Sequence, residues 1–77
     1  MAKIHTQKSV REACADLSNT VGVSHVRFGR VRVERIDNVL GLSLGNYLVR
    51  VWHMDKCIIE GRFNQVIRAI IHEANRA

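Results

Sequence analysis

Residues 26–36, VRFGRVRVERI, alternate apolar and charged side chains over most of their length. A period of two is typical of a β-strand with one buried face, so this segment predicts a sheet with one side in the core and one side open. Phe28 and Val31 are an odd number of positions apart, which would send them to opposite faces of a regular strand. We predict a bulge at Gly29-Arg30, because glycine tolerates the backbone that a bulge often needs and the extra residue restores the phase. A break into two short strands at Gly29 is the alternative.

Three short polar segments downstream predict tight turns. They are Asp37-Asn38, Gly45-Asn46 and Asp55-Lys56. The first two have the composition of two-residue hairpin loops. The residues between these turns then complete a four-stranded antiparallel meander, with strands at about residues 39–44, 47–54 and 58–63. In this arrangement Val33 faces Leu42, and Leu40 faces Val51, so that Val31, Val33, Val49 and Val51 lie on one apolar face of the sheet.

The register of the last strand depends on the length of the loop before it. A two-residue turn at Asp55-Lys56 would place Glu60 and Arg62 on the buried face, where unpaired charges are costly. A three-residue loop, residues 55–57, would instead bury Ile59, Gly61 and Phe63. We therefore predict the three-residue loop.

Both ends of the chain predict amphipathic helices. Ser9 and Glu12 have the S-x-x-E form of a capping box, so a first helix is expected over residues 10–20, before Gly22. Asn64 is expected to cap a second helix. Each helix has an apolar stripe, the first at Val10, Ala13, Cys14 and Leu17, and the second at Val66, Ile67, Ile70, Ile71 and Ala74.

The two stripes and the apolar sheet face together predict an α+β domain. It is a two-layer sandwich in which a four-stranded antiparallel meander carries the N- and C-terminal helices on one face, in the order α-β-β-β-β-α. The 77 residues form a single domain, with residues 1–8 as a flexible N-terminus. Because so small a domain buries little core, we expect a homodimer.

The charge of the chain predicts an anionic partner. Twelve Lys plus Arg against seven Asp plus Glu give a formal net charge of +5, and nine of the twelve cations are arginine, whose planar fork binds phosphate and carboxylate well. No apolar run is long enough for a membrane helix and the N-terminus lacks the features of a signal peptide, so we expect a cytoplasmic protein without a membrane partner. Cys14 and Cys57 are interpreted as small buried apolar groups.

The open face of the sheet is the candidate site. It should carry five arginines and the single tryptophan, a composition that suits nucleic acid: Arg27, Arg30, Arg32, Arg50, Arg62 and Trp52. Beside them, apolar side chains are expected to form one contiguous patch that suits a protein surface: Ile36, Val39, Trp52, Met54 and Ile58. The leading hypothesis is a small basic module that binds nucleic acid. The alternative is a protein-binding inhibitor or adaptor, for example a small regulatory or phage-type accessory protein that engages an acidic protein surface.

Catalytic and metal chemistry are not predicted. His53, Asp55 and Cys57 alternate around a turn, but no second ligand pair accompanies them and their spacing matches no zinc motif. Glu34 and Glu60 are flanked by arginines on an open sheet, and no cleft is evident to exclude water, so they do not suggest an acid/base pair. We therefore expect no enzymatic activity, no cofactor and no metal site.

The order of helix, strands and helix resembles the double-stranded RNA-binding domain in outline. That family carries a lysine-rich K-K-x-A-K motif at the start of its last helix, whereas residues 64–68, NQVIR, hold one cation, and the predicted strands number four rather than three. No functional residue is carried over from this resemblance.

Overall fold

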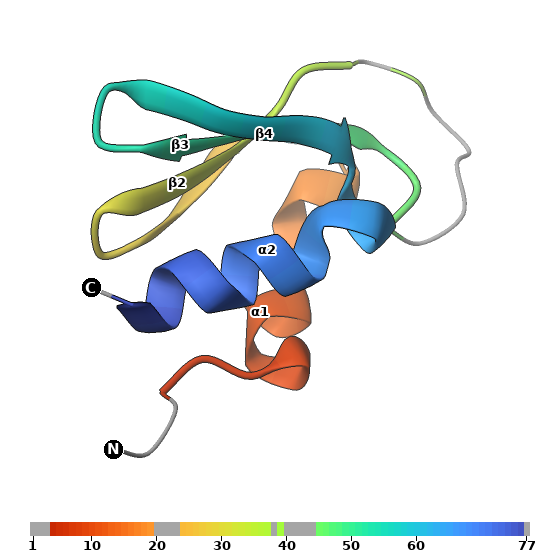
Figure 1. Ribbon diagram of the computed structural model, residues 1–77. Coiled ribbons are helices and arrows are strands. Elements are labelled where there is room, and N and C mark those ends of the chain that lie inside the picture. The colour runs from red at the N-terminus through yellow and green to blue at the C-terminus, as the bar shows by residue number, and fades with distance from the viewer. Residues whose placement is uncertain (1–3, 20–23, 38, 40–44, 77) are drawn as a thin grey trace.

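The computed structural model describes residues 4–19, 24–37, 39 and 45–76, and its centre is a four-stranded antiparallel sheet (Figure 1). The strands lie in the order β1-β2-β3-β4, so each pairs with its neighbours in sequence. This confirms the predicted α+β class, with one helix at each end of the chain. The elements are α1 (Gln7–Ala13), the 3-10 helix η1 (Ala15–Asn19), β1 (His25–Phe28), β2 (Val31–Arg35), β3 (Leu48–His53), β4 (Lys56–Arg62) and α2 (Phe63–Arg76).

One face of the sheet is packed against helix. α2 lies along β2, β3 and β4, and α1 packs against α2 (Figure 1). The central strands contribute four valines with no exposed surface, Val31, Val33, Val49 and Val51. Full burial of such a side chain contributes about 1.5 to 3 kcal/mol, so these positions fix which face of the sheet is inside. The side chains between them point to the opposite, outer face.

The segment 26–36 forms two strands and not one bulged strand. β1 and β2 are joined by a two-residue turn at Gly29-Arg30, with Phe28 directly opposite Val31. Gly29 has φ +61°, the conformation that a type II′ hairpin loop requires at its first position. The predicted bulge is therefore wrong and the alternative break is confirmed. Both arrangements use a glycine with unusual backbone and both bring Phe28 and Val31 to the same face, so the alternation alone does not separate them.

The predicted strand at residues 39–44 has no counterpart among the described residues. Residues 38 and 40–44 lie outside the described part of the chain, and Val39 is not in a strand. β2 pairs directly with β3, so that Val33 lies opposite Val51. The predicted pairing of Leu40 with Val51 is therefore wrong, and so is the pairing of Val33 with Leu42.

β4 has the predicted facing but reaches it by a different route. The predicted three-residue loop at residues 55–57 is wrong, because His53 lies opposite Lys56 and the loop is a two-residue turn at Met54-Asp55. An irregularity between Val51 and Trp52 then shifts the register, because Val51 pairs with Ile59 while Trp52 pairs with Cys57. The shift turns Ile59 toward the core and leaves Glu60 and Arg62 exposed, as predicted.

Both helices begin earlier than predicted. Thr6 caps α1: its hydroxyl accepts from the Ser9 amide at 3.2 Å, while the Ser9 hydroxyl accepts from the Thr6 amide at 2.8 Å. Ser9 is therefore the third helical residue and not the cap. α2 follows β4 without a break and begins at Phe63, so Asn64 is inside the helix. Apart from exposed Ala13 and half-buried Ile71, the predicted stripes are buried in the core cluster.

Candidate functional site

The outer face of the sheet carries its side chains in two rows across all four strands. Backbone pairing aligns the first row as Arg27, Arg32, Trp52 and Cys57, and the second as His25, Glu34, Arg50 and Glu60. The first row lies nearer the two hairpin turns. The predicted arrangement in which arginines and the tryptophan share an open face is therefore confirmed for these residues.

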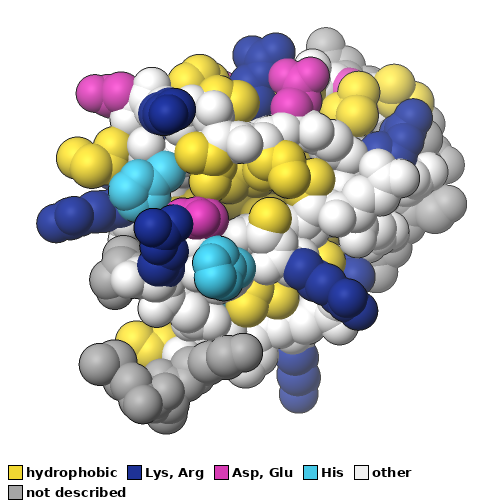
Figure 2. All heavy atoms as spheres, in the orientation of Figure 1, with side chains coloured by type: hydrophobic (Ala, Val, Ile, Leu, Met, Phe, Trp, Pro, Cys, Tyr) yellow, Lys and Arg dark blue, Asp and Glu magenta, His cyan; other side chains and the backbone are white. Residues whose placement is uncertain are grey.

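The two hairpin turns lie side by side at one end of the sheet. The Met54 amide donates a hydrogen bond to the Arg30 carbonyl at 3.0 Å, which joins the two turns. Next to this contact is a hollow of about 270 Å³, which we call the tip site, lined by Arg27, Gly29, Arg30, Arg32, Met54 and Asp55. A second hollow of about 390 Å³ lies on the other side of Arg30, lined also by His53, Lys56, Ile58, Glu73 and Arg76. Cationic side chains project from this end of the molecule (Figure 2).

Three arginines of the tip site have no acidic partner within the described part of the chain. Arg27 and Arg32 are directly opposite each other on β1 and β2, where like charges are destabilising. The guanidinium of Arg32 lies 5.3 Å from the centre of the Trp52 ring, and its Nε is buried without a hydrogen-bond partner. Arg30 is exposed at the turn. Because its lining residues include only one carboxylate, Asp55, beside the three arginines, the tip site has a net positive charge.

The other predicted arginines, Arg50 and Arg62, form hydrogen bonds with other groups of the protein. Arg50 Nε donates to Glu60 Oε1 at 2.7 Å, and this hydrogen bond, with the charge of the carboxylate, raises the pKa of Arg50. Arg62 donates to the Asn46 carbonyl at 2.9 Å. The five arginines therefore do not act as one group, and Arg27, Arg30 and Arg32 form the separate cluster at the tip.

The predicted apolar patch is divided between two regions. Trp52, Met54 and Ile58 lie toward the hairpin turns, with the Trp52 indole N–H donating to Glu34 at 3.2 Å. Ile36 lies at the opposite end of β2, where its amide donates to the Leu48 carbonyl at 3.0 Å, and Val39 follows it in the chain. The expectation of one contiguous patch depended on a strand at residues 39–44 beside Trp52, and β2 occupies that place instead.

Arg35 is the residue whose role sequence analysis missed. Its side chain is only 5% exposed and lies on the core face of β2, opposite Val49. It donates to Asp37 Oδ1 at 2.9 Å, to the Leu17 carbonyl at 2.6 Å and to the Val39 carbonyl at 2.8 Å, and it stacks on Tyr47 at 4.8 Å. The sequence could have indicated this position, because Arg35 continues the alternation of Val31 and Val33 and so belongs to the same buried face of the strand.

Asp37 completes this internal network. Its Oδ2 accepts from the Leu48 amide at 2.8 Å. Desolvation by burial would raise the pKa of Asp37, but the Leu48 hydrogen bond and the Arg35 guanidinium together lower it below its usual value of 3.8. Asp37 therefore stays ionised at neutral pH, and its bonds to Arg35 and Leu48, with the bond from Arg35 to Leu17, join β2, β3 and η1.

The two cysteines differ in environment. Cys14 is buried, and desolvation raises the pKa of its thiol to about 12, so it is an unreactive core group as predicted. Cys57 is exposed on the outer face, which corrects the prediction that it is buried. Within the described residues, no group of three or more His, Cys, Asp or Glu side chains is placed to hold a metal ion.

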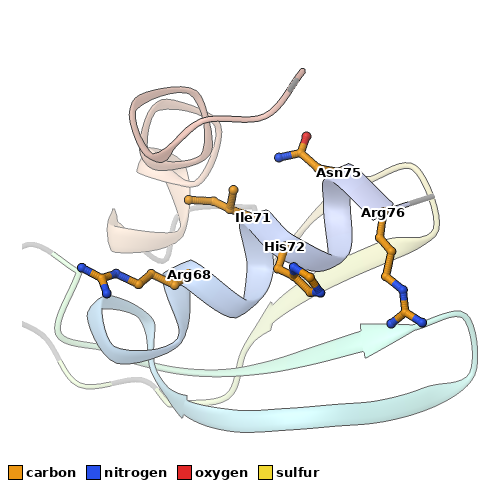
Figure 3. A pocket seen from close by; sticks show the side chains of 5 residues that line it. All are labelled: Arg68, Ile71, His72, Asn75 and Arg76. Carbon is orange, nitrogen blue, oxygen red and sulfur yellow. The ribbon is translucent and has the colours of Figure 1, made fainter. Parts of the chain in front are cut away.

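A further hollow, of about 440 Å³, lies on α2 and is lined by Arg68, Ile71, His72, Asn75 and Arg76 (Figure 3). Its side chains come from successive turns of one helix and do not converge on a common point, with Arg68 and Arg76 pointing to opposite ends. Asn75 is also occupied, because its side chain exchanges two hydrogen bonds with the backbone of His5. This hollow therefore offers no assembled set of binding groups.

Comparison with protein families, with curated proteins and with solved structures finds no match to this chain. Among the described helices, none has the length and apolar character needed to cross a membrane.

Proposed function

We propose that this protein is a non-catalytic module that binds the phosphate backbone of nucleic acid through Arg27, Arg30 and Arg32 of the tip site. The observation that carries the proposal is the direct opposition of Arg27 and Arg32 on neighbouring strands without a carboxylate partner in the described structure. Opposed like charges weaken a sheet, and an anionic ligand between them would remove that repulsion. Arginine also suits phosphate because its fork donates two parallel hydrogen bonds.

The form of the site supports binding that depends little on base sequence. Sheet surfaces that read RNA sequence use two or three stacking aromatics, whereas this face has Trp52 alone. One face of that ring is already near the Arg32 guanidinium. Phosphate contact and counterion release are then the main source of affinity, so binding should weaken steeply as salt rises.

The test is a titration of fluorescein-labelled single- and double-stranded oligonucleotides, followed by anisotropy at low and near-physiological salt. Arg30→Glu should weaken binding at least tenfold, because it reverses the charge shared by both hollows. Arg68→Glu is the matched control, since it makes the same change of net charge on an exposed position of α2. Wild-type binding no tighter than about 100 μM near physiological salt, or equal losses in the two variants, would contradict the proposal.

A second candidate is a protein-binding inhibitor or adaptor, or a homodimer, that uses the apolar side chains near the turns. The observation that favours it is the exposure of Met54 (63%) and Ile58 (38%) close to the β3–β4 turn. Light scattering over a dilution series tests the homodimer. Ile58→Asp should shift a dimer to monomer, whereas Val39→Asp, at an exposed position outside this group, should not.

A further inference from the structure

Met54 has a backbone conformation that side chains avoid. Its φ is +57°, at the first position of the two-residue turn between β3 and β4. Gly29 occupies the same position of the neighbouring turn with φ +61°. Glycine adopts this conformation without steric conflict, whereas the Cβ of any other L-residue meets its own backbone there. The two adjacent hairpin turns thus share a positive φ at their first position, but only the β1–β2 turn has a glycine there.

Nothing in the packing of the described chain explains why a methionine stands at this position. Met54 is 63% exposed and is not part of the core cluster. A strained residue that the fold does not need is a candidate for contact with a ligand. The position of Met54 agrees with this, because it lines the tip site together with Arg27, Arg30 and Arg32.

We propose that the tip site binds single-stranded nucleic acid, with one base packed against the Met54 side chain while the three arginines hold the adjoining phosphates. This inference rests on the proposed function and specifies its ligand. The thioether is polarisable and packs well against aromatic rings, and a single strand leaves its base faces open. A duplex covers those faces by stacking, so it would offer the arginines phosphates and leave Met54 without a partner. The hollow of about 270 Å³ is also close to the roughly 300 Å³ at which small-ligand sites begin.

Three variants separate the contact from the strain. Met54→Gly removes both the side chain and the strain, Met54→Ala removes most of the side chain but keeps the strained φ, and Met54→Leu keeps an apolar side chain of similar size. Each is titrated by anisotropy with a labelled single strand of about 12 nucleotides and with a duplex of the same length. Thermal unfolding is measured on the same samples.

We expect Met54→Gly to unfold at a temperature a few degrees higher than wild type, because glycine relieves the turn. The same variant should bind the single strand about fivefold more weakly, which is the lower end of the effect of removing an aromatic side chain that stacks on a base. Met54→Ala should lose the same affinity without the gain in stability, and Met54→Leu should bind like wild type. Duplex affinity should stay within twofold for all three.

Single-strand affinity unchanged in Met54→Gly would overturn this inference, and so would equal losses for single strand and duplex. In either case the effect of Arg30→Glu would still stand, so the proposed function would survive. If wild type binds no oligonucleotide, both proposals fail together.

Discussion

Arg35 joins three separate segments of the chain from a position that is almost wholly buried. Its guanidinium donates to Leu17 in η1 and to Asp37 and Val39 in the segment after β2. It also stacks on the ring of Tyr47, which precedes β3. A buried arginine is tolerated only when its donors are satisfied, and here three acceptors and an aromatic face surround it. Its role is structural, although it belongs to the same alternating segment as the arginines of the tip site.

Arg35→Met tests this distinction at the level of one residue. The change leaves Asp37 without its cation and the Leu17 and Val39 carbonyls without a donor, so the free energy of unfolding should fall by about 3 kcal/mol, as for loss of one partner of a buried pair. Urea denaturation followed by circular dichroism measures it. Arg32→Met is the matched control, because it makes the same replacement on the outer face of the same strand and should change stability by less than about 1 kcal/mol. Similar losses in both variants would contradict the structural role of Arg35.

At the level of elements, the contact between the start of α2 and the segment before β3 holds the helix on the sheet. The Asn64 amide donates to the Gly45 carbonyl at 3.0 Å, and the Phe63 amide donates to the Tyr47 carbonyl at 2.9 Å. Gly45 has φ +76°, and a Cβ placed on it would collide with the side chain of Asn64. Glycine suits this position because of its backbone conformation, and any other residue would also have to displace the Asn64 side chain, whose Oδ1 accepts a hydrogen bond from Arg11 at 2.8 Å.

Gly45→Ala should consequently destabilise the protein more than Gly29→Ala. Gly29 has a similar φ of +61°, but a Cβ there would meet no atom within 4 Å, so this variant should lose only the strain of about 1 to 2 kcal/mol. Gly45→Ala adds the collision with Asn64, and we expect its loss to be larger by at least about 1 kcal/mol. Urea unfolding of the two variants side by side measures the difference. Equal losses would mean that Asn64 moves aside at little cost.

The sequence predicted faces of elements better than their connections. The alternation of apolar and polar residues correctly predicted that Val31, Val33, Val49 and Val51 are buried. Exposing an apolar side chain costs free energy in any strand, so this prediction does not depend on which strands pair. The alternation did not distinguish a hairpin from a bulge at Gly29, since one glycine with positive φ serves both. It also could not foresee the shift in β4 near Ile58 that restores the predicted facing. Local pattern thus fixes what is buried, while pairing between strands depends on the whole sheet.

At the scale of the whole molecule, the positive charge of the outer sheet face is distributed differently from what the sequence suggests. A net charge of +5 with five arginines expected on the open face predicted one basic surface. Pairing between strands brings Arg50 beside Glu60 and leaves Arg27 opposite Arg32, so one end of the face is balanced and the other is not. The sequence predicted that Arg27, Arg32, Arg50 and Trp52 share the face, but the division into a neutral and a basic end follows from register, which no single segment encodes.

This division makes a prediction about salt dependence. If Arg27 neutralises a phosphate, Arg27→Gln should reduce the slope of log affinity against log salt by roughly one and weaken binding at low salt. Arg50→Gln removes the same charge from a residue that Glu60 already neutralises, so its effect on the slope should be clearly smaller. Anisotropy titrations at four salt concentrations give the slopes of wild type and both variants. Equal slopes for the two variants would mean that the outer face attracts nucleic acid by its overall charge, and the assignment of the contact to the tip site would then be wrong.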